Sequence, residues 1–312
     1  MDRVAILGNF DGVHMGHQRL IKKAIDFAKK NGYETVVYTF STLPNNKKYI
    51  MTVTEKINEI KKLGVDKIFV DDFYNVKNYT PSEFVTEILM HTLKAKKVFC
   101  GYNYTFGVNK SGNIHTLSKL IDTTIVDEIK VDDIITSSSV IRSFLEQGNI
   151  ELANKLLGKA YKISGVVIHG KKLGRTIGFP TANIRPNALK VSIPLGVYGV
   201  KLTIDGDEKV YTAIMNIGKN PTVNTTDTIT AEANILDFNE DIYGKSITIS
   251  ILKMLRHEKK FDSLEQLKEQ ISSDKKMWRS IADDYNQNWK FWRSIRSFIT
   301  LNWRKKDGYT KY

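Results

Sequence analysis

The sequence has almost none of the features that mark secreted or membrane proteins. Its 312 residues include one cysteine, Cys100, which excludes an internal disulfide and any four-cysteine zinc site. No unbroken apolar run approaches the length of a transmembrane helix. The first strand-like residues follow Met1 so closely that a signal peptide has no room. We therefore expect a cytoplasmic protein without a transmembrane segment.

The common nucleotide-binding and metalloprotease signatures are also missing. The chain has no Gly-x-x-x-x-Gly-Lys-(Ser/Thr) loop, no Gly-x-Gly-x-x-Gly fingerprint and no His-Glu-x-x-His motif. What it does have is an excess of basic residues, with a formal net charge of +13 at pH 7. This charge indicates an anionic partner, which could be nucleic acid, a membrane surface or nucleotide phosphates. Charge alone does not choose among these three.

A glycine-rich corner between a strand and a helix is the most informative stretch. Residues 4–7 predict a short apolar strand, and residues 16–30 predict an amphipathic helix. Gly8 and Gly12 relieve the intervening turn of Cβ crowding, and Gly16 lets a ligand approach the first turn of the helix. The free N–H groups and the positive dipole end of that helix favour an anion. The corner therefore predicts a phosphate site.

Two histidines, His14 and His17, lie three residues apart at the start of this helix. At that spacing their imidazoles can converge on one ligand. Two other interpretations stay open from the residues alone: a structural loop with solvated histidines, and a zinc site for which Asp11 is the nearby third ligand.

Strands and helices alternate through the first half of the chain, which predicts a parallel sheet with helices on both faces. The predicted strands cover residues 4–7, 35–40, 67–70 and 97–100, and the helices between them cover residues 16–30, 55–63 and 81–93. Ligands of such sheets bind beyond the carboxyl ends of the strands. The corner that begins at Gly8 and the loops after Phe40 and Gly101 are therefore candidate binding segments.

The second half differs in composition, because β-branched segments separated by glycine and proline dominate it. Strands are predicted at residues 163–168, 197–204, 210–217, 229–236 and 246–252, followed by a closing helix over 264–285. This pattern is typical of a small antiparallel barrel. We therefore predict domains at 1–158 and 159–285, with residues 286–312 as a basic aromatic C-terminal extension.

The corner Gly8-Asn-Phe-Asp-Gly-Val-His-Met-Gly-His17 resembles nucleotidyltransferases with a His-x-Gly-His motif, and in full it resembles the bacterial bifunctional riboflavin kinase/FAD synthetase family. Gly174-Arg-Thr-Ile-Gly-Phe-Pro-Thr-Ala-Asn-Ile184 is similar to the riboflavin kinase module of that family. The resemblance spans roughly residues 4–285. It implies an α/β nucleotidyltransferase domain, built on a parallel sheet, followed by a small antiparallel β-barrel riboflavin kinase domain.

The resemblance also implies two reactions that share ATP and Mg²⁺. The second module would convert riboflavin and ATP to FMN, and the first would convert FMN and ATP to FAD with release of pyrophosphate. The implied partners are these small molecules, with no obligate nucleic acid, and a homo-oligomer is left open.

Site residues of the first module follow by position. His14, His17 and Arg142 would donate hydrogen bonds to phosphate during adenylyl transfer. The implied ATP- and flavin-binding residues are Gly8, Asn9, Phe10, Asp11, Gly16, Asn103, Ser138 and Ser139.

In the second module, Glu232 would be the general base that takes the proton of the ribityl 5′-hydroxyl. Thr181 and Asn183 would bind Mg²⁺ and ATP with hard oxygen ligands. The remaining implied nucleotide- and flavin-binding residues are Gly170, Lys172, Gly174 and Arg256.

One departure from the family pattern and the unusual tail motivate two alternatives. Leu43 stands where the family usually has a basic residue, so the chain could be a riboflavin kinase with an impaired adenylyltransferase half, unless Lys47 or Lys48 assists. Residues 286–312 mix tryptophans with lysines and arginines, which could stack on nucleic acid in a flavin-responsive binder. The sequence gives neither the purpose of this tail nor the relative rates.

Overall fold

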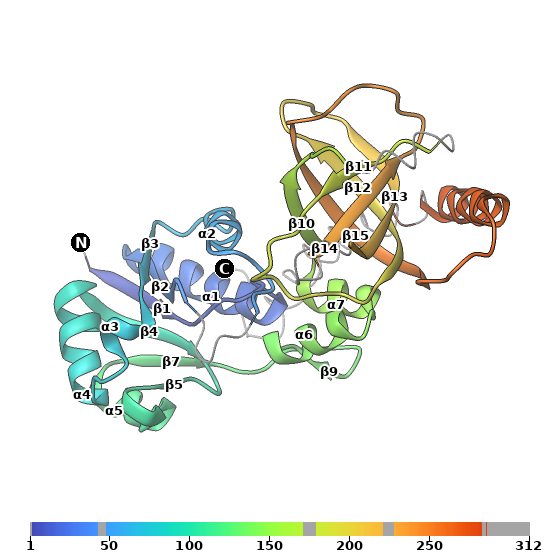
Figure 1. Ribbon diagram of the computed structural model, residues 1–312. Helices are drawn as coiled ribbons and strands as arrows, with labels where there is room; N and C mark the ends of the chain where they lie inside the picture. Colours follow the sequence, from blue (N-terminus) through green and yellow to red (C-terminus); the bar gives the residue numbers. More distant parts are fainter. Residues whose placement is uncertain (1, 43–47, 171–178, 221–227, 283–284, 286–312) are drawn as a thin grey trace, which may run out of the picture. The chain divides into compact units, whose positions relative to one another are not determined.

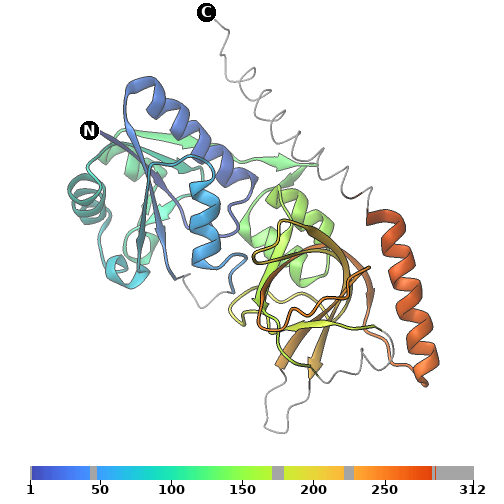
Figure 2. The ribbon, with the colours of Figure 1, turned by 90° about the horizontal axis from the view of Figure 1, so that it is seen from above.

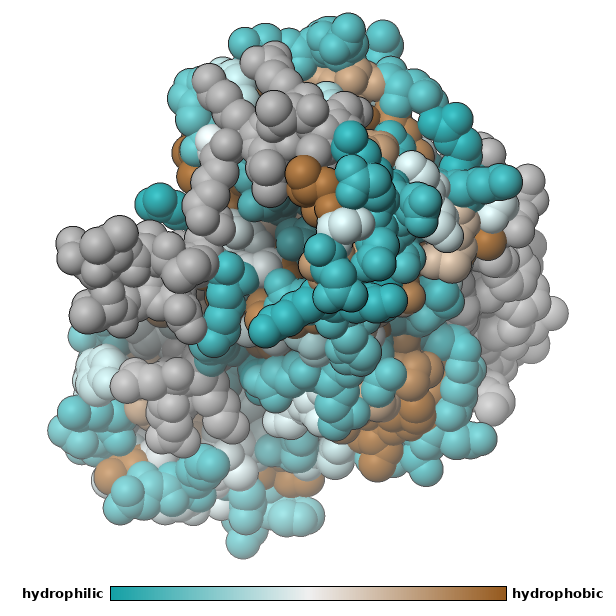
Figure 3. Space-filling model, turned by 45° about the vertical axis from the view of Figure 1, so that its right-hand side comes forward, coloured by the Kyte–Doolittle hydropathy of each residue, from teal (hydrophilic) through white to brown (hydrophobic). Residues whose placement is uncertain are grey.

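The computed structural model describes residues 2–42, 48–170, 179–220, 228–282 and 285, and they fall into two compact units (Figure 1). The first unit contains the described residues up to Arg142 together with Leu189–Val191, and the second contains the rest. Among the described helices, none combines the length and apolar composition that crossing a bilayer requires. Hydrophilic side chains predominate on the face shown in Figure 3, and hydrophobic ones form smaller patches there.

A five-stranded parallel sheet forms the centre of the first unit, in the order β3-β2-β1-β4-β7 (Figure 1). Its strands are β1 (Arg3–Leu7), β2 (Glu34–Phe40), β3 (Lys67–Asp71), β4 (Ala95–Gly101) and β7 (Thr123–Val126). The chain runs outward from β1 to β3 and then continues on the other side of β1 with β4. The direction of winding therefore reverses between β1 and β4, where open α/β sheets bind ligands. The predicted parallel sheet is confirmed.

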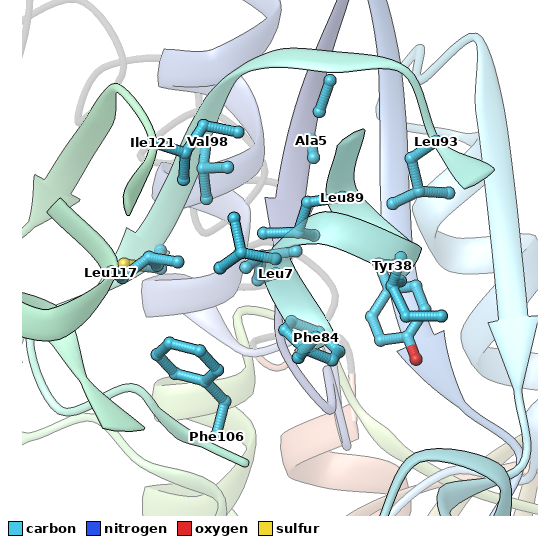
Figure 4. Close-up of a cluster of buried hydrophobic side chains, with 14 of the residues drawn as sticks. Ala5, Leu7, Tyr38, Phe84, Leu89, Leu93, Val98, Phe106, Leu117 and Ile121 are labelled. Carbon is cyan, nitrogen blue, oxygen red and sulfur yellow. The ribbon is translucent and has the colours of Figure 1, made fainter. Parts of the chain in front are cut away.

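Helices cover both faces of this sheet because β1 is apolar on both sides. Val4 and Ile6 pack against α1 (Met15–Asn31) and α2 (Val53–Lys61). Leu7, which points to the opposite face, packs in the cluster of Figure 4 with η2 (Phe84–Thr92), a π-helix that continues α4 (Pro81–Glu83), and with α5 (Ile114–Leu120). A strand buried on both faces reads as a continuous apolar run, as here.

Shorter elements complete the first unit and lead into the second. They are α3 (Phe73–Val76), β5 (Thr105–Phe106), η3 (Val108–Lys110), β6 (Gly112–Asn113), β8 (Lys130–Val131), β9 (Ile134–Ile135), α6 (Ser138–Glu146) and α7 (Ile150–Leu157). The last of them, α7, ends at Gly158, whose φ of 68° is the left-handed cap that glycine favours.

A segment from the second half of the sequence belongs to the first unit. The Tyr49 N–H donates to the Leu189 carbonyl at 2.7 Å, and the Val191 N–H donates to the Tyr49 carbonyl at 2.8 Å. Between them, the buried Lys190 ammonium forms an ion pair with Glu55 at 2.6 Å. The strand-like segment around Tyr49 is thus held by residues 140 positions later in the chain.

The second unit is built on a six-stranded antiparallel sheet in the order β10-β15-β12-β13-β14-β11. The strands are β10 (Tyr161–Val166), β11 (Ala182–Ile184), β12 (Gly196–Ile204), β13 (Val210–Asn220), β14 (Thr228–Ile235) and β15 (Ser246–His257). The sheet curls (Figure 2), and a bridge between Ile168 and Asn183 joins its two edges. This confirms the predicted small antiparallel barrel.

A helix over residues 264–282 lies beside the curled sheet (Figure 2). Its Trp278 is fully buried against Val197 and Ile214 on the outer face of the sheet. The indole fits because position 199 is a glycine: a Cβ on Gly199 would come within 2.3 Å of the Trp278 ring. The helix therefore covers part of the outer face of the barrel.

Candidate active sites

The corner after β1 has an unusual backbone. Phe10 and Val13 adopt positive φ values of 51° and 40°, in addition to 83° at Gly12. Such angles are rare for a β-branched or aromatic residue. Both side chains are buried, and Gly8 makes room for the Phe10 ring, which a Cβ at position 8 would approach to 3.0 Å. Strained backbone held in place by packing is concentrated at functional sites in proteins.

The structure brings the two predicted histidines together. His14 is the N-cap of α1, and its Nδ1 accepts a hydrogen bond from the His17 N–H at 3.3 Å. The two rings stack at a centroid distance of 3.5 Å, and the Phe10 ring lies edge-on to His17 at 5.1 Å. Because Nδ1 of His14 accepts, a neutral His14 ring carries its hydrogen on Nε2, where it can donate to an anion. Gly16 leaves room for the His14 ring, because a Cβ at position 16 would lie only 3.2 Å from ring atoms of His14.

Asp11 joins the corner to the start of α6. Its carboxylate accepts from the Ile50 N–H at 3.0 Å, from the Met51 N–H at 3.1 Å and from Arg142 Nη2 at 2.8 Å. The Ser138 hydroxyl donates to the Asp11 carbonyl at 2.9 Å. Asp11, Ser138 and Arg142, all predicted site residues, thus form one network.

This network argues against the zinc interpretation of the histidine pair. The Asp11 carboxylate is buried and already occupied by an arginine and two backbone N–H groups. Within the part of the chain that the structure describes, no group of three or more His, Cys, Asp or Glu side chains could hold a metal ion.

The sequence analysis missed a buried lysine at the same corner. Lys56 on α2 is 4% exposed, and its ammonium donates to the Asn9 carbonyl at 3.1 Å, to the Thr39 hydroxyl at 3.0 Å and to the Phe40 carbonyl at 2.6 Å. Burial lowers the pKa of Lys56 to about 8, and the negative charge of Asp11 opposes that shift. The spacing of Lys56 and Ile60, four residues apart on one helix face, was the available signal.

The lowered pKa of Lys56 predicts a specific dependence of stability on pH. Lys56 has a pKa of about 8 in the folded state and its ordinary pKa of 10.5 in the unfolded state. Between pH 8 and pH 10.5 the unfolded state therefore holds more protons. Stability therefore rises with pH in this window, by up to about 3 kcal/mol from this residue. We expect the melting temperature of the wild type to rise between pH 7 and pH 9.5 relative to that of Lys56→Met, measured by scanning fluorimetry. A difference between the two that stayed constant over this range would contradict the assignment.

The other predicted residues of the first unit are more exposed. Asn103 is exposed in the turn after β4, and Ser139 is exposed in the first turn of α6. The Ser137 hydroxyl accepts from the Val140 N–H at 3.3 Å, the capping role that serine commonly has there. Leu43 and Lys47 lie outside the described residues, whereas the Lys48 carbonyl accepts from Arg142 Nε at 3.1 Å.

In the second unit, the sheet register aligns three polar residues. Glu232 on β14 is paired directly with Asn183 on β11 and with Asn216 on β13. Directly paired residues of antiparallel strands point to the same face, with Cβ atoms about 5 Å apart. Asn183 Nδ2 donates to the carbonyl and hydroxyl oxygens of Thr181 at 3.2 and 3.3 Å. The predicted base and the predicted metal ligands therefore lie side by side.

Gly170 is the residue that allows Asn183 its position. A Cβ at position 170 would lie 2.7 Å from Asn183 Nδ2 and 2.9 Å from Oδ1. The Ile168 N–H also donates to the Asn183 carbonyl at 2.8 Å, so the backbone cannot simply move away. Position 170 must therefore be glycine if the Asn183 amide is to stay in place.

We expect Gly170→Ala to lower FMN formation from riboflavin about tenfold or more, because displacing a positioned ligand by a fraction of an ångström is costly. Conversion of supplied FMN to FAD should be unchanged, since it involves the other unit. Both rates can be followed by chromatographic separation of the flavins. Gly206→Ala controls for the general cost of replacing a glycine, because no atom lies within 4 Å of an added Cβ there although its φ of 81° disfavours alanine. Equal rates for the two variants would contradict this role of Gly170.

A pocket of about 370 Å³ adjoins Asn183. It is lined by Val167, Gly170, Pro180, Thr181, Ala182, Asn183, Ala233, Ile235 and residues 238–243. Its size is in the range of small-molecule sites. Glu232 does not line this pocket; β14 contributes Ala233 and Ile235 to it, and their side chains alternate with that of Glu232 along the strand.

Three predicted binding residues of the second unit remain. Lys172 and Gly174 lie outside the described residues. Arg256 on β15 donates through Nε to the buried carboxylate of Asp274 at 2.9 Å, and Asp274 also accepts from Gln270 at 2.9 Å. The helix over 264–282 thus orients the Arg256 side chain.

Comparisons with known proteins match each half of the chain to a family model. The FAD synthetase family model matches residues 1–144, and the riboflavin kinase family model matches residues 157–282. The bifunctional riboflavin kinase/FMN adenylyltransferase of Bacillus subtilis (strain 168) is 38% identical over 287 residues, which are 87% of this chain and 90% of the relative. The protein of the same name from Listeria monocytogenes is 37% identical over 294 residues, covering 90% and 93%.

A solved structure matches most of the chain as well. The crystal structure titled macrolide-efflux protein from Streptococcus pneumoniae superposes with a TM-score of 0.83 at 33% identity, covering 89% of this chain and 94% of that one. The relatives from Bacillus subtilis, Listeria monocytogenes and Escherichia coli (strain K12) thus each match both halves of this sequence, at 34% identity or more. The chain therefore belongs to the bifunctional riboflavin kinase/FMN adenylyltransferase family.

Proposed function

We propose that this chain phosphorylates riboflavin to FMN in its second unit and adenylylates FMN to FAD in its first. The observation that carries the proposal is the separation of two chemically different sites. One has Glu232 paired with Asn183, whose amide contacts Thr181, and the other has two stacked imidazoles at the N-terminus of α1. The first set suits deprotonation of a hydroxyl, and the second suits binding of phosphate.

In the kinase reaction, Glu232 takes the proton of the ribityl 5′-hydroxyl while that oxygen attacks the γ-phosphorus of ATP. ADP leaves, and the phosphoryl group becomes that of FMN. The pocket beside Asn183 takes the nucleotide. Thr181 Oγ1 and Asn183 Oδ1 are hard oxygen ligands suited to Mg²⁺. Asn183 Nδ2 donates to Thr181, so the amide orientation leaves Oδ1 as the atom that could bind the metal. When bound, Mg²⁺ would neutralise charge on the phosphate oxygens.

In the adenylyl-transfer reaction, a phosphate oxygen of FMN attacks the α-phosphorus of ATP, and pyrophosphate leaves. No protein nucleophile is needed, so positioning and charge neutralisation carry the step. The Nε2 of His14, the His17 ring and the first-turn N–H groups of α1 supply donors. Arg142 adds a permanent positive charge that Asp11 holds in place at 2.8 Å.

The organisation around these reactions is part of the proposal. The FMN adenylyltransferase domain occupies residues 1–158, the riboflavin kinase domain 159–285, and the extension 286–312. The chain works on small molecules in the cytoplasm and needs no nucleic-acid partner. The single cysteine supports the cytoplasmic location, and the pocket of about 370 Å³ beside Asn183 suits a small molecule.

Incubation of the purified protein with riboflavin, ATP and Mg²⁺, with chromatographic separation of the flavins, tests the function. We expect FMN to appear first and FAD to follow, and we expect supplied FMN to give FAD directly. Absence of any phosphorylated flavin would contradict the proposal. FMN that accumulates without FAD would instead favour the second candidate, a riboflavin kinase alone, which Leu43 motivates.

A further inference from the structure

The ammonium of Lys56 connects the ends of two adjacent strands in the first unit. Asn9 follows β1, and Thr39 and Phe40 end β2; all three accept hydrogen bonds from Lys56 Nζ within 3.1 Å. The Thr39 hydroxyl in turn donates to the Asn9 carbonyl at 3.0 Å. The Asn9 carbonyl is therefore held by two donors at once.

The position of that carbonyl matters because the strained backbone begins at the next residue. Phe10 has a φ of 51°, and the corner continues through Asp11 and Val13 to His14 at the start of α1. A strained segment keeps its conformation only where its surroundings determine it closely. Lys56 and Thr39 hold the entry of the corner, while Arg142 and Ser138 hold Asp11 in its middle.

The charge of Lys56 has a second effect. Its three acceptors are uncharged oxygens, and the nearby carboxylate, Asp11, already pairs with Arg142. The cluster of Lys56, Arg142 and Asp11 therefore carries an excess of one positive charge beside the corner. Burying a cation without a carboxylate of its own is costly for folding. An anion bound at the corner would offset this cost.

We propose that Lys56 is a positioning residue of the adenylyl-transfer site, which fixes the corner from Asn9 to His14 and adds positive charge behind the triphosphate of ATP. The inference rests on the proposed adenylylation of FMN in the first unit. It assigns Lys56 no contact with the reacting atoms.

Lys56→Met tests the inference, because methionine keeps an unbranched apolar stem and loses the ammonium. We expect kcat/KM for FAD formation to fall about 10- to 100-fold, with a higher KM for ATP, because a shifted corner misplaces the nucleotide. Riboflavin phosphorylation by the same sample should be unchanged, which controls for folding and concentration. Lys61→Met, an exposed lysine on the same helix, is the matched control and should stay within about twofold of the wild type.

Two further variants separate charge from hydrogen bonding. Lys56→Arg keeps the charge and should recover part of the activity lost in Lys56→Met. Thr39→Val removes one hydroxyl and keeps the volume, so it should raise the KM for ATP even if Lys56→Met fails to fold. FAD formation by Lys56→Met at the wild-type rate would overturn the inference, as would a lower rate with an unchanged KM for ATP and no recovery by arginine. A wild type that forms no FAD would instead refute the proposed function itself.

Discussion

Glu232→Gln is expected to reduce the formation of FMN from riboflavin by about 10²- to 10⁴-fold, the usual worth of a general base. Glutamine has nearly the same shape as glutamate but cannot accept the proton of the ribityl hydroxyl. The sheet register supports the role, because it sets Glu232 directly opposite Asn183, whose amide contacts Thr181. The KM values for riboflavin and ATP should change little. Initial rates with radiolabelled ATP would separate kcat from KM.

The same Glu232→Gln protein should still convert supplied FMN to FAD at the wild-type rate, since the adenylyl-transfer groups belong to the first unit. Glu208→Gln is a suitable control, because Glu208 is exposed in the turn between β12 and β13. Loss of both activities in a protein with an unchanged melting temperature would contradict separate sites. Retention of FMN formation would remove Glu232 from the mechanism.

His17→Ala is expected to affect the other reaction from Glu232→Gln and to lower FAD formation about 10²- to 10³-fold. That is the usual effect of removing one positioned donor to a developing negative charge. The substitution removes the ring that stacks on His14 at 3.5 Å and that contacts Phe10. FMN formation from riboflavin should be unchanged. The measurement is the time course of FMN and FAD in the chromatographic assay, where FMN should accumulate.

His115→Ala provides the control for His17→Ala, because His115 is an exposed histidine on α5 of the same unit. It should leave both rates as they are. Substituting His14 is a less clean experiment, since the His14 ring also caps α1 and its removal costs about 1 kcal/mol of helix stability. Normal FAD formation by His17→Ala would show that the stacked pair has no part in adenylyl transfer.

Local patterns were enough to predict the sheets but not every strand in them. The apolar run at residues 4–7 and the glycines after it predicted β1 and the corner, because burial on both faces and a tight turn each have a sequence signature. The four-residue strand β7 was not predicted, and neither was β11, since Pro180-Thr-Ala-Asn183 is typical of a turn and that strand is three residues long. β11 exists through its pairing with β14, whose residues lie 47 to 51 positions later in the chain, a contact that no local pattern contains.

The residues that support the sites were harder to predict than those within them. His14, His17 and Arg142 belong to strings that resemble a family, so they could be named from the sequence. Lys56 is one of 47 lysines and arginines, and its burial and three distant acceptors distinguish it more than its spacing from Ile60 does. Such acceptors meet at one point only after three separate segments have folded.

The tripeptide Leu189–Val191, which belongs to the first unit, limits how the chain can be rearranged. The connection between β11 and β12 looks like an ordinary surface loop in the sequence, yet its backbone pairs with Tyr49 and its Lys190 holds Glu55. Inserting a reporter or an epitope there should disrupt the protein, whereas the turn at residues 205–209 should accept one. The length of this connection is therefore constrained by the first unit, to which its middle residues belong.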